Sequence, residues 1–164
     1  QRARGVDGVE VGGRLLVALT AALSAGAEHV NPAATGQGWE RRHDLLAAGL
    51  DDVELDPGLV RHVLSNFIAN AMDAMPQGGK LTVGARRQGS ELVLYVADTG
   101  EGIRPEDRKH IFEPFFTTKP KGKGTGLGLP ICREISLALK GHIDVQSTLG
   151  QGSTFALHTP WPGV

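Results

Sequence analysis

The stretch Val63–Met75 reads "VLSNFIANAMDAM", in which apolar residues recur at helical spacing and polar ones interrupt them regularly. At 100° per residue, the apolar side chains fall on one side of a helix. The polar stripe on the opposite side consists of His62, Asn66, Asn70 and Asp73. Upstream, Asp56 and Pro57 offer an N-cap oxygen and a proline at the first helical position. We therefore predict a helix from Asp56 to about Met75. Its amides are poor helix formers, which favours a role in binding over simple solvation.

Strands and further helices are predicted on either side of this segment. The runs "LTVGARR" and "ELVLYVAD" indicate an antiparallel hairpin around "QGS", and "HIDVQST" and "STFALHT" indicate another around "LGQG". Helices are expected from about Gly13 to Ser24 and from about Leu127 to Leu139, and a strand within Trp39–Leu46. Mostly antiparallel strands mixed with helices predict an α+β class, with one layer of helices on one sheet.

Length and charge restrict the classes of function. The 164 residues suit one domain, which we assign to residues 9–164 after a lead-in at residues 1–8. Seventeen basic against 18 acidic residues give no bulk charge to favour nucleic acid or an anionic membrane. A single cysteine, Cys132, and the lack of a spanning apolar run or signal pattern predict a cytoplasmic setting. Because the chain starts at Gln1, we expect a longer parent protein, which could be membrane-anchored.

The segment 119–129, "KPKGKGTGLGL", holds four glycines and three lysines. It does not fit a P-loop, because each Gly-Lys pair is followed by Leu or Gly, and it lacks the spacing of a dinucleotide fingerprint. What remains is a flexible basic loop that leads into the first turn of a helix, where free backbone N–H groups favour a phosphate. The alternative is a mobile surface loop with solvated lysines.

A third segment, "DTGEGI" at residues 98–103, follows directly on a predicted strand. Asp98 could accept a hydrogen bond from an exocyclic amine, and Gly100 and Gly102 would let a flat base approach the backbone. The carbonyl and carboxylate oxygens of the polar stripe are hard ligands that suit Mg²⁺. Together these segments indicate an adenine acceptor, a metal ligand and a phosphate loop in one chain.

In this order the segments resemble the ATP-binding catalytic domain of sensor histidine kinases, within the superfamily that includes DNA gyrase, the ninety-kilodalton heat-shock chaperones and the mismatch-repair ATPase. The matching boxes are "VLSNFIANAMDAM", "DTGEGI", "FEPFFTTK", "GTGLGL" and "GQGSTF", over roughly residues 55–160. The wording of the glycine-rich region is most similar to nitrogen-regulatory-type kinases. The resemblance implies a two-layer α/β sandwich of the Bergerat type, a mixed, mostly antiparallel sheet covered on one face by about three helices.

The resemblance also implies residue roles. Asn70 would coordinate Mg²⁺, Asn66 would sit beside the phosphates, and both would be catalytic. Asp98 would accept from the adenine amine with the help of a water that Ser153 also holds, and Phe112, Phe115 and Phe116 would anchor the glycine-rich lid. The implied nucleotide-binding residues are Asn66, Asn70, Asp73, Asp98, Gly100, Gly102, Ile103, Phe112, Lys119, Lys123, Gly124, Thr125, Gly126, Leu127, Gly128, Leu129 and Ser153.

One difference from the hydrolases of this superfamily indicates which group accepts the phosphoryl group. The superfamily's hydrolases carry a glutamate four residues before the metal asparagine, where this chain has Asn66, which cannot act as a base. The expected activity is transfer from Mg-ATP to a histidine on a separate helical dimerisation domain, and then to a response-regulator receiver domain. No nucleic acid and no direct membrane contact are expected. His43 is a weaker candidate for the acceptor within this chain, and His62 is the histidine expected nearest the ligand. The alternatives are an anti-sigma-factor-type serine kinase and a degenerate docking module without catalysis.

Overall fold

The computed structural model describes residues 39–45 and 55–161. The elements in chain order are β1 (Trp39–Leu45), α3 (Pro57–Asp73), β2 (Gly79–Gln88), β3 (Glu91–Asp98), α4 (Gly128–Ala138), β4 (His142–Thr148) and β5 (Gly152–Pro160). The helix predicted over residues 13–24 and the lead-in at residues 1–8 lie outside the described residues. Within the described part, two helices are present where about three were expected for the whole fold.

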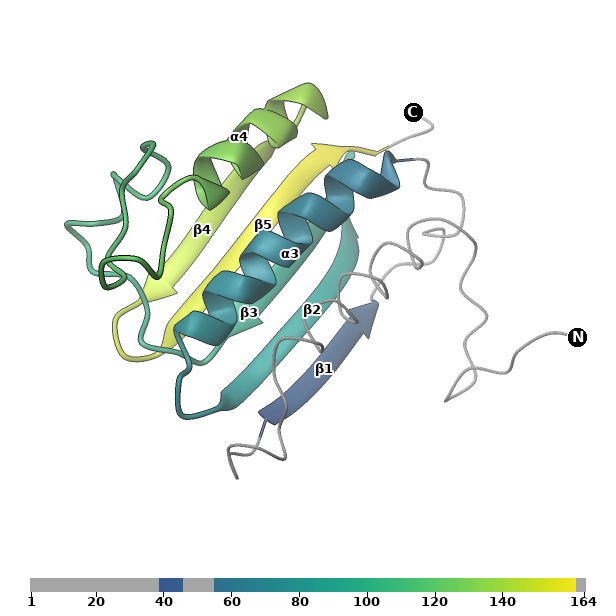
Figure 1. Ribbon diagram of the computed structural model, residues 1–164. Coiled ribbons are helices and arrows are strands. Elements are labelled where there is room, and N and C mark those ends of the chain that lie inside the picture. The colour runs from purple at the N-terminus through teal and green to yellow at the C-terminus, as the bar shows by residue number, and fades with distance from the viewer. Residues whose placement is uncertain (1–38, 46–54, 162–164) are drawn as a thin grey trace, which may run out of the picture.

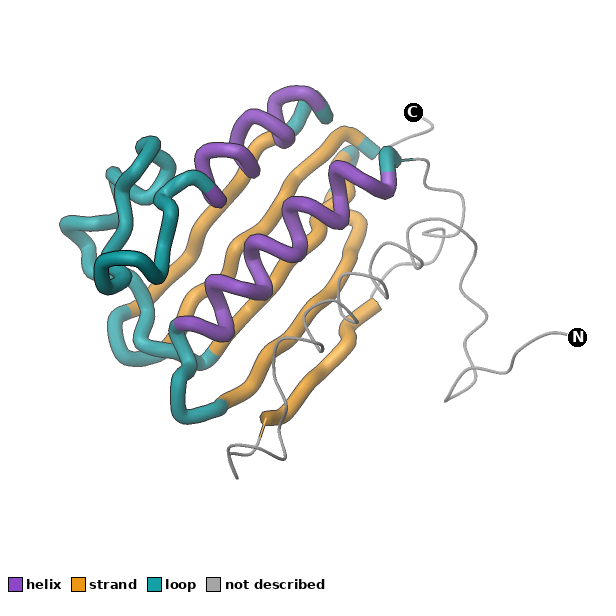
Figure 2. The backbone as a smooth tube through the Cα atoms, in the orientation of Figure 1, coloured by secondary structure: helices purple, strands orange, loops and turns teal. Residues whose placement is uncertain are grey.

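The five strands form one sheet in the order β1-β2-β3-β5-β4. β1 runs parallel to β2, and every other neighbouring pair is antiparallel. Both α3 and α4 lie on the same face of this sheet (Figure 1). The long loop between β3 and α4 lies beside one end of the sheet, next to the start of α4 (Figure 2). The α+β sandwich with a mixed, mostly antiparallel sheet is therefore confirmed.

The helix α3 begins where the sequence indicates and ends slightly earlier. Asp56 Oδ1 accepts hydrogen bonds from the backbone N–H of Gly58 at 2.8 Å and of Leu59 at 3.1 Å, so it caps two free donors. The last helical residue is Asp73, two positions before the predicted end at Met75. Pro76 disfavours helical geometry at the residue before it, which accounts for the earlier end.

The apolar face of α3 forms the core against alternate residues of the sheet. Phe67 is fully buried, and its ring centroid lies 5.3 Å from that of Phe155 on β5. The buried residues of this face are Val60, Val63, Leu64, Phe67, Ile68 and Ala71. They pack in one cluster with the β3 residues Leu92, Leu94 and Val96. The predicted apolar side of the helix is confirmed, and the polar stripe consequently faces away from the core.

The helix α4 lies within one residue of its predicted limits. Cys132 on this helix is fully buried, and burial raises the pKa of its thiol to about 12, as expected for a core residue. The helix ends at Ala138 with Leu139 as its C-cap, and the next residue, Lys140, has a left-handed φ of 57°. In the part of the chain that the structure describes, no helix combines the length and apolar character needed to cross a membrane.

Candidate functional site

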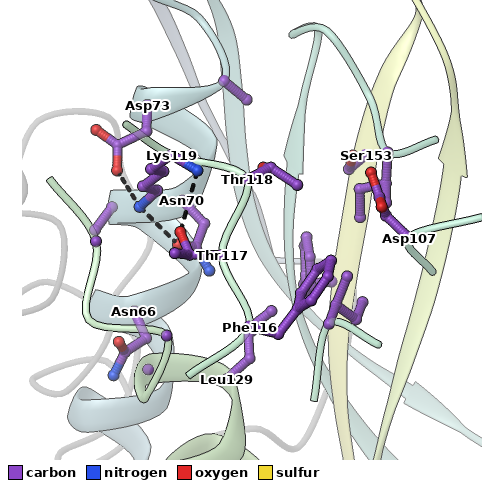
Figure 3. Close-up of a pocket in the computed structure, with 18 of the residues that line it drawn as sticks. Asn66, Asn70, Asp73, Asp107, Phe116, Thr117, Thr118, Lys119, Leu129 and Ser153 are labelled. Atoms are coloured by element: carbon purple, nitrogen blue, oxygen red, sulfur yellow. Dashed lines mark hydrogen bonds and ion pairs between the residues drawn. The ribbon is translucent and has the colours of Figure 1, made fainter. Parts of the chain in front are cut away.

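A cavity of about 660 Å³ opens between α3, the start of α4 and the loop at residues 99–127. This volume is typical of pockets that hold small molecules. Figure 3 shows Asn66, Asn70 and Asp73 projecting from α3 on one side of the cavity, with Ser153 and Asp107 on the other. The predicted site residues on its wall are Asn66, Asn70, Asp73, Asp98, Gly102, Ile103, Lys119, Lys123, Gly124, Thr125, Gly126, Gly128, Leu129 and Ser153. The fold thus brings together three segments that are far apart in the sequence.

Asp98 is the buried acid of this cavity. It ends β3 and is only 8% exposed. Its Oδ1 accepts from the backbone N–H of Gly100 at 2.8 Å and of Ser153 at 3.2 Å. Burial raises the pKa of Asp98, and these two hydrogen bonds partly counteract that effect. Among the described residues no donor pairs with Oδ2, so this oxygen can accept a hydrogen bond from a ligand.

A serine pair supports the same wall of the cavity. The Ser153 hydroxyl lies 2.9 Å from the Ser147 hydroxyl, which donates to the carbonyl of Gly152 at 3.2 Å. The backbone N–H of Ile103 in turn donates to Ser147 Oγ at 2.8 Å. These bonds connect the ends of β4 and β5 to the "DTGEGI" segment, so Asp98 and Ser153 are held in fixed positions on the wall.

Two side-chain oxygen atoms on the polar stripe of α3 contact the positively charged end of a lysine. The Lys119 ammonium lies 2.5 Å from Asp73 Oδ2 and 3.5 Å from Asn70 Oδ1 (Figure 3). A carboxylate and an amide oxygen that converge on one cation are the ligand types that Mg²⁺ prefers. The residues present therefore fit the Mg²⁺ that the resemblance implies, with Asn70 as ligand and Asp73 beside it. Asn66, one turn earlier, donates from Nδ2 to the His62 carbonyl at 3.1 Å.

The glycine-rich loop covers the cavity through close backbone contacts. Gly126 has a left-handed φ of 68°, and a Cβ there would lie 2.4 Å from the backbone of Phe115. The Phe115 N–H donates to the Gly126 carbonyl at 2.9 Å, which joins the two sides of the loop. A Cβ at Gly128 would lie 2.5 Å from Asn66 Oδ1, so α4 begins directly against the polar stripe of α3. Glycine at both positions permits this packing.

Some predicted residues lie elsewhere. Gly100, Phe112 and Leu127 do not line the cavity. A Cβ at Gly100 would meet the backbone of Ala74, so glycine there permits close contact with the end of α3. Phe115 was expected to anchor the lid, but its side chain is 75% exposed, so that expectation is wrong for this structure. Its φ of 67° turns the backbone to meet Gly126.

Among the residues whose side chains the structure describes, from 55 to 161, no histidine lines the cavity wall. His62 is exposed on α3 and is absent from the lining residues, although it was the histidine expected nearest the ligand. His43 lies in β1, the edge strand of the sheet.

Other wall residues were not predicted. They include the charged residues Glu101, Arg104 and Asp107 and the threonines Thr117 and Thr118. Arg104 Nε donates to Asp107 Oδ2 at 2.8 Å, which stabilises the loop where it passes the cavity. The threonine pair immediately precedes Lys119 within "FEPFFTTK" and was a usable signal. Glu101 lies within "DTGEGI" itself, whereas Arg104 and Asp107 follow it in a stretch without regular structure, which carried no signal of its own.

The fold and the cavity define a two-layer α/β sandwich with a polar pocket at one end of its sheet. A family profile described as histidine kinase-, DNA gyrase B-, and HSP90-like ATPase matches residues 55–163. The chain therefore belongs to this ATPase family and is a histidine kinase-type ATPase domain.

Characterised relatives of this chain are sensor kinases. Sporulation kinase C of Bacillus subtilis is 40% identical over 105 residues, which cover 64% of this chain and 24% of that protein. Sensor histidine kinase ZraS of Escherichia coli is 40% identical over 111 residues, which cover 68% of this chain and 23% of that protein. The chain thus spans about a quarter of the length of each of these relatives.

Solved structures show the same fold. The catalytic domain of histidine kinase ThkA, in a nucleotide-free form, superposes with a TM-score of 0.74 at 27% identity, covering 91% of this chain and 93% of that one. Full-length ShkA in complex with AMPPNP gives a TM-score of 0.73 at 31% identity, covering 93% of this chain and 32% of that one.

Proposed function

We propose that this domain binds Mg-ATP and transfers the γ-phosphoryl group to a histidine on a separate helical dimerisation domain, from which a response-regulator aspartate receives it. The observation that carries the proposal is the position of Asn70 and Asp73 on one side of the cavity and of Asp98 on the other, beneath a glycine-rich loop. The sensor-kinase relatives and the AMPPNP complex of ShkA support it. With ATP as substrate, the domain is expected to act in the cytoplasm.

Each side of the cavity has a separate task in this proposal. Asp98 Oδ2 accepts from the exocyclic amine of adenine, and the fixed carboxylate selects an amine donor at that position. Asn70 would hold the metal with Asp73 next to it, and Asn66 would lie beside the phosphates. Bound Mg²⁺ neutralises phosphate oxygens. Lys119 and Lys123 on the loop add positive charge, and the glycines at 124, 126 and 128 bring backbone N–H groups close to the phosphates.

The cavity is suited to transfer and not to hydrolysis. Asn66 occupies the position where a base would activate water, and an amide cannot take a proton. Asp73 and Asp107 are paired with Lys119 and Arg104, respectively. Phosphoryl transfer depends mainly on positioning and charge neutralisation, which this arrangement supplies without a base at position 66. The incoming imidazole brings its own lone pair as the nucleophile.

The test is a phosphotransfer assay with γ-labelled ATP, Mg²⁺ and the histidine-bearing helical domain of the parent kinase. The expected product carries label that is lost in acid and retained in base, as for phosphohistidine. Acid-stable label would instead support the serine-kinase alternative. The absence of both label and ATP binding would support the docking-module alternative and contradict the proposal.

A further inference from the structure

A second group of side chains lies at the end of the sheet farthest from the cavity. Glu91 begins β3, His142 begins β4, and His158 lies two residues before the last residue of β5. One potential ligand atom from each of the three residues lies within 4.8 Å of the other two. The proposed phosphotransfer uses none of them.

The register of the sheet creates this group. His158 pairs with Val93 on β3 and with His142 on β4, so these residues share one face of the sheet. Glu91 lies two residues before Val93 and points to that same face. This is the face opposite α3 and α4, because the alternate residues Leu92 and Leu94 pack in the helix-covered core.

Backbone packing and a hydrogen bond hold the three side chains together. A Cβ at Gly141 would collide with the His158 carbonyl oxygen, so glycine lets the start of β4 press against β5. His158 Nδ1 lies 3.0 Å from Glu91 Oε2, and the His158 side chain is only 11% exposed. The His142 ring stacks on that of His158, with centroids 4.5 Å apart and planes inclined by 17°.

The stacked pair is suited to a shared cation. Two protonated imidazoles at this separation would repel each other, whereas neutral imidazoles are common metal ligands. His142 is exposed and, among the described residues, has no hydrogen-bond partner. Its ring nitrogens are therefore available to a metal once the ring turns from its stacked position, while the Glu91 contact already orients His158.

We propose that Glu91, His142 and His158 form a binding site for a divalent transition metal of the zinc class. Zinc binds imidazole nitrogen and carboxylate oxygen at about 2.1 Å, which places tetrahedral ligand atoms about 3.4 Å apart. The contact between Glu91 and His158 is already close to that spacing, and the metal would replace the proton that they share. Rotation of the exposed His142 side chain brings in the third ligand, and water completes the shell.

This site is independent of the nucleotide cavity. Glu91 and Asp98 are seven residues apart on β3, which corresponds to about 23 Å along an extended strand. A metal here joins β3, β4 and β5 at the end of the sheet farthest from the cavity. It is expected to stabilise the fold by binding only the folded state, without changing ATP affinity.

The test is calorimetric titration of the domain with zinc chloride at saturating Mg²⁺ and without nucleotide, with cobalt(II) absorption as a second readout. One zinc equivalent should bind and raise the melting temperature. His142→Ala should lower the affinity for this zinc ion by at least about tenfold, because it removes a ligand. The matched control is His62→Ala, which removes an exposed histidine from α3 and should bind zinc as the parent chain does.

A second variant keeps the proposal testable if loss of the stacked ring disturbs folding. Glu91→Gln retains the size and an acceptor oxygen but not the charge, and it should also weaken zinc binding. Equal zinc affinity in the parent chain and His142→Ala, or no saturable zinc binding, would overturn the proposal. ATP titrations of the same variants should be unchanged, so failure here is distinct from failure of the proposed kinase function.

Discussion

The Lys119 ammonium lies 2.5 Å from Asp73 Oδ2, so the glycine-rich loop and α3 meet beside Asn70, the residue that we assign to the metal. These two side chains are 33% and 55% exposed, and a pair of this kind contributes little to stability. The position of the pair is what matters. In the proposed complex Asn70 would hold Mg²⁺ at this corner, and Lys119 would pair with a phosphate.

Lys119→Met should therefore lower ATP affinity by about three- to fivefold, or about 1 kcal/mol, because one phosphate-binding charge is lost. Lys121→Met is the matched control. Lys121 belongs to the same loop and is exposed, but it does not line the cavity. Titration calorimetry at fixed ionic strength measures both variants. Equal losses would indicate a general charge effect and would remove the specific role of Lys119.

Asn70→Ala should abolish Mg²⁺-dependent phosphotransfer and leave the fold intact, because Asn70 is half-buried at the cavity and outside the core cluster. Radiolabel transfer measures the activity, and thermal unfolding checks the fold. His62→Ala on the same helix lies outside the cavity wall and should transfer normally. Normal transfer by the Asn70 variant would remove the metal assignment.

Gly126→Ala should reduce ATP affinity much more than adenosine affinity. The new Cβ would meet the Phe115 backbone, and alanine disfavours the left-handed φ of 68°. Gly122→Ala separates these two effects, because Gly122 has a φ of 84° but nothing within 4 Å of a Cβ. Competitive binding of ATP and adenosine to both variants provides the measurement. Equal ATP affinities in the two variants would show that the contact with Phe115 is unimportant.

Asp98 should make adenosine binding depend on pH. Burial raises the pKa of Asp98 in the folded protein above its value in the unfolded chain. Above this raised pKa the buried carboxylate is ionised and lowers folding stability, and this loss of stability disappears as the pH falls. As pH falls from neutral through the raised pKa, the carboxyl gains a proton and no longer accepts from the adenine amine. Adenosine affinity should therefore decline in that interval.

The matched variant for this prediction is Asp98→Asn. Its amide can still accept from the Gly100 and Ser153 N–H groups, but it places a donor opposite the adenine amine. The variant should bind adenosine weakly at every pH and should not be less stable than the parent chain near neutral pH. Adenosine titrations and thermal unfolding across pH measure both effects. A pH-independent affinity in the parent chain would contradict the role of Asp98.

Helical periodicity was sufficient to predict α3 and its polar stripe. The spacing that buries Phe67 also turns Asn66 and Asn70 away from the core, so one pattern gives both the fold and one wall of the cavity. Asp98 was predictable because a carboxylate directly after a strand lies at a sheet end. Most of the glycine-rich loop was predicted for the same cavity, since it leads directly into α4.

Long-range backbone contacts determine the parts of the structure that the sequence did not predict. Gly100 was expected against a base, but it packs on Ala74, which lies 26 residues earlier in the chain. The expectation that Phe115 anchors the lid did not account for the left-handed turn at this residue, which meets Gly126. The cluster of Glu91, His142 and His158 depends on strand register, which a single sequence does not fix.

Calorimetric titration of the domain with ATP, with and without Mg²⁺, tests the central claim most directly. Asn70 and Asp73 lie on one side of the cavity, and Asp98 lies on the other. We predict saturable binding of one ATP that Mg²⁺ strengthens in the parent chain and fails to strengthen in Asn70→Ala. Absence of ATP binding under both conditions would contradict the account and would leave the domain as a docking module.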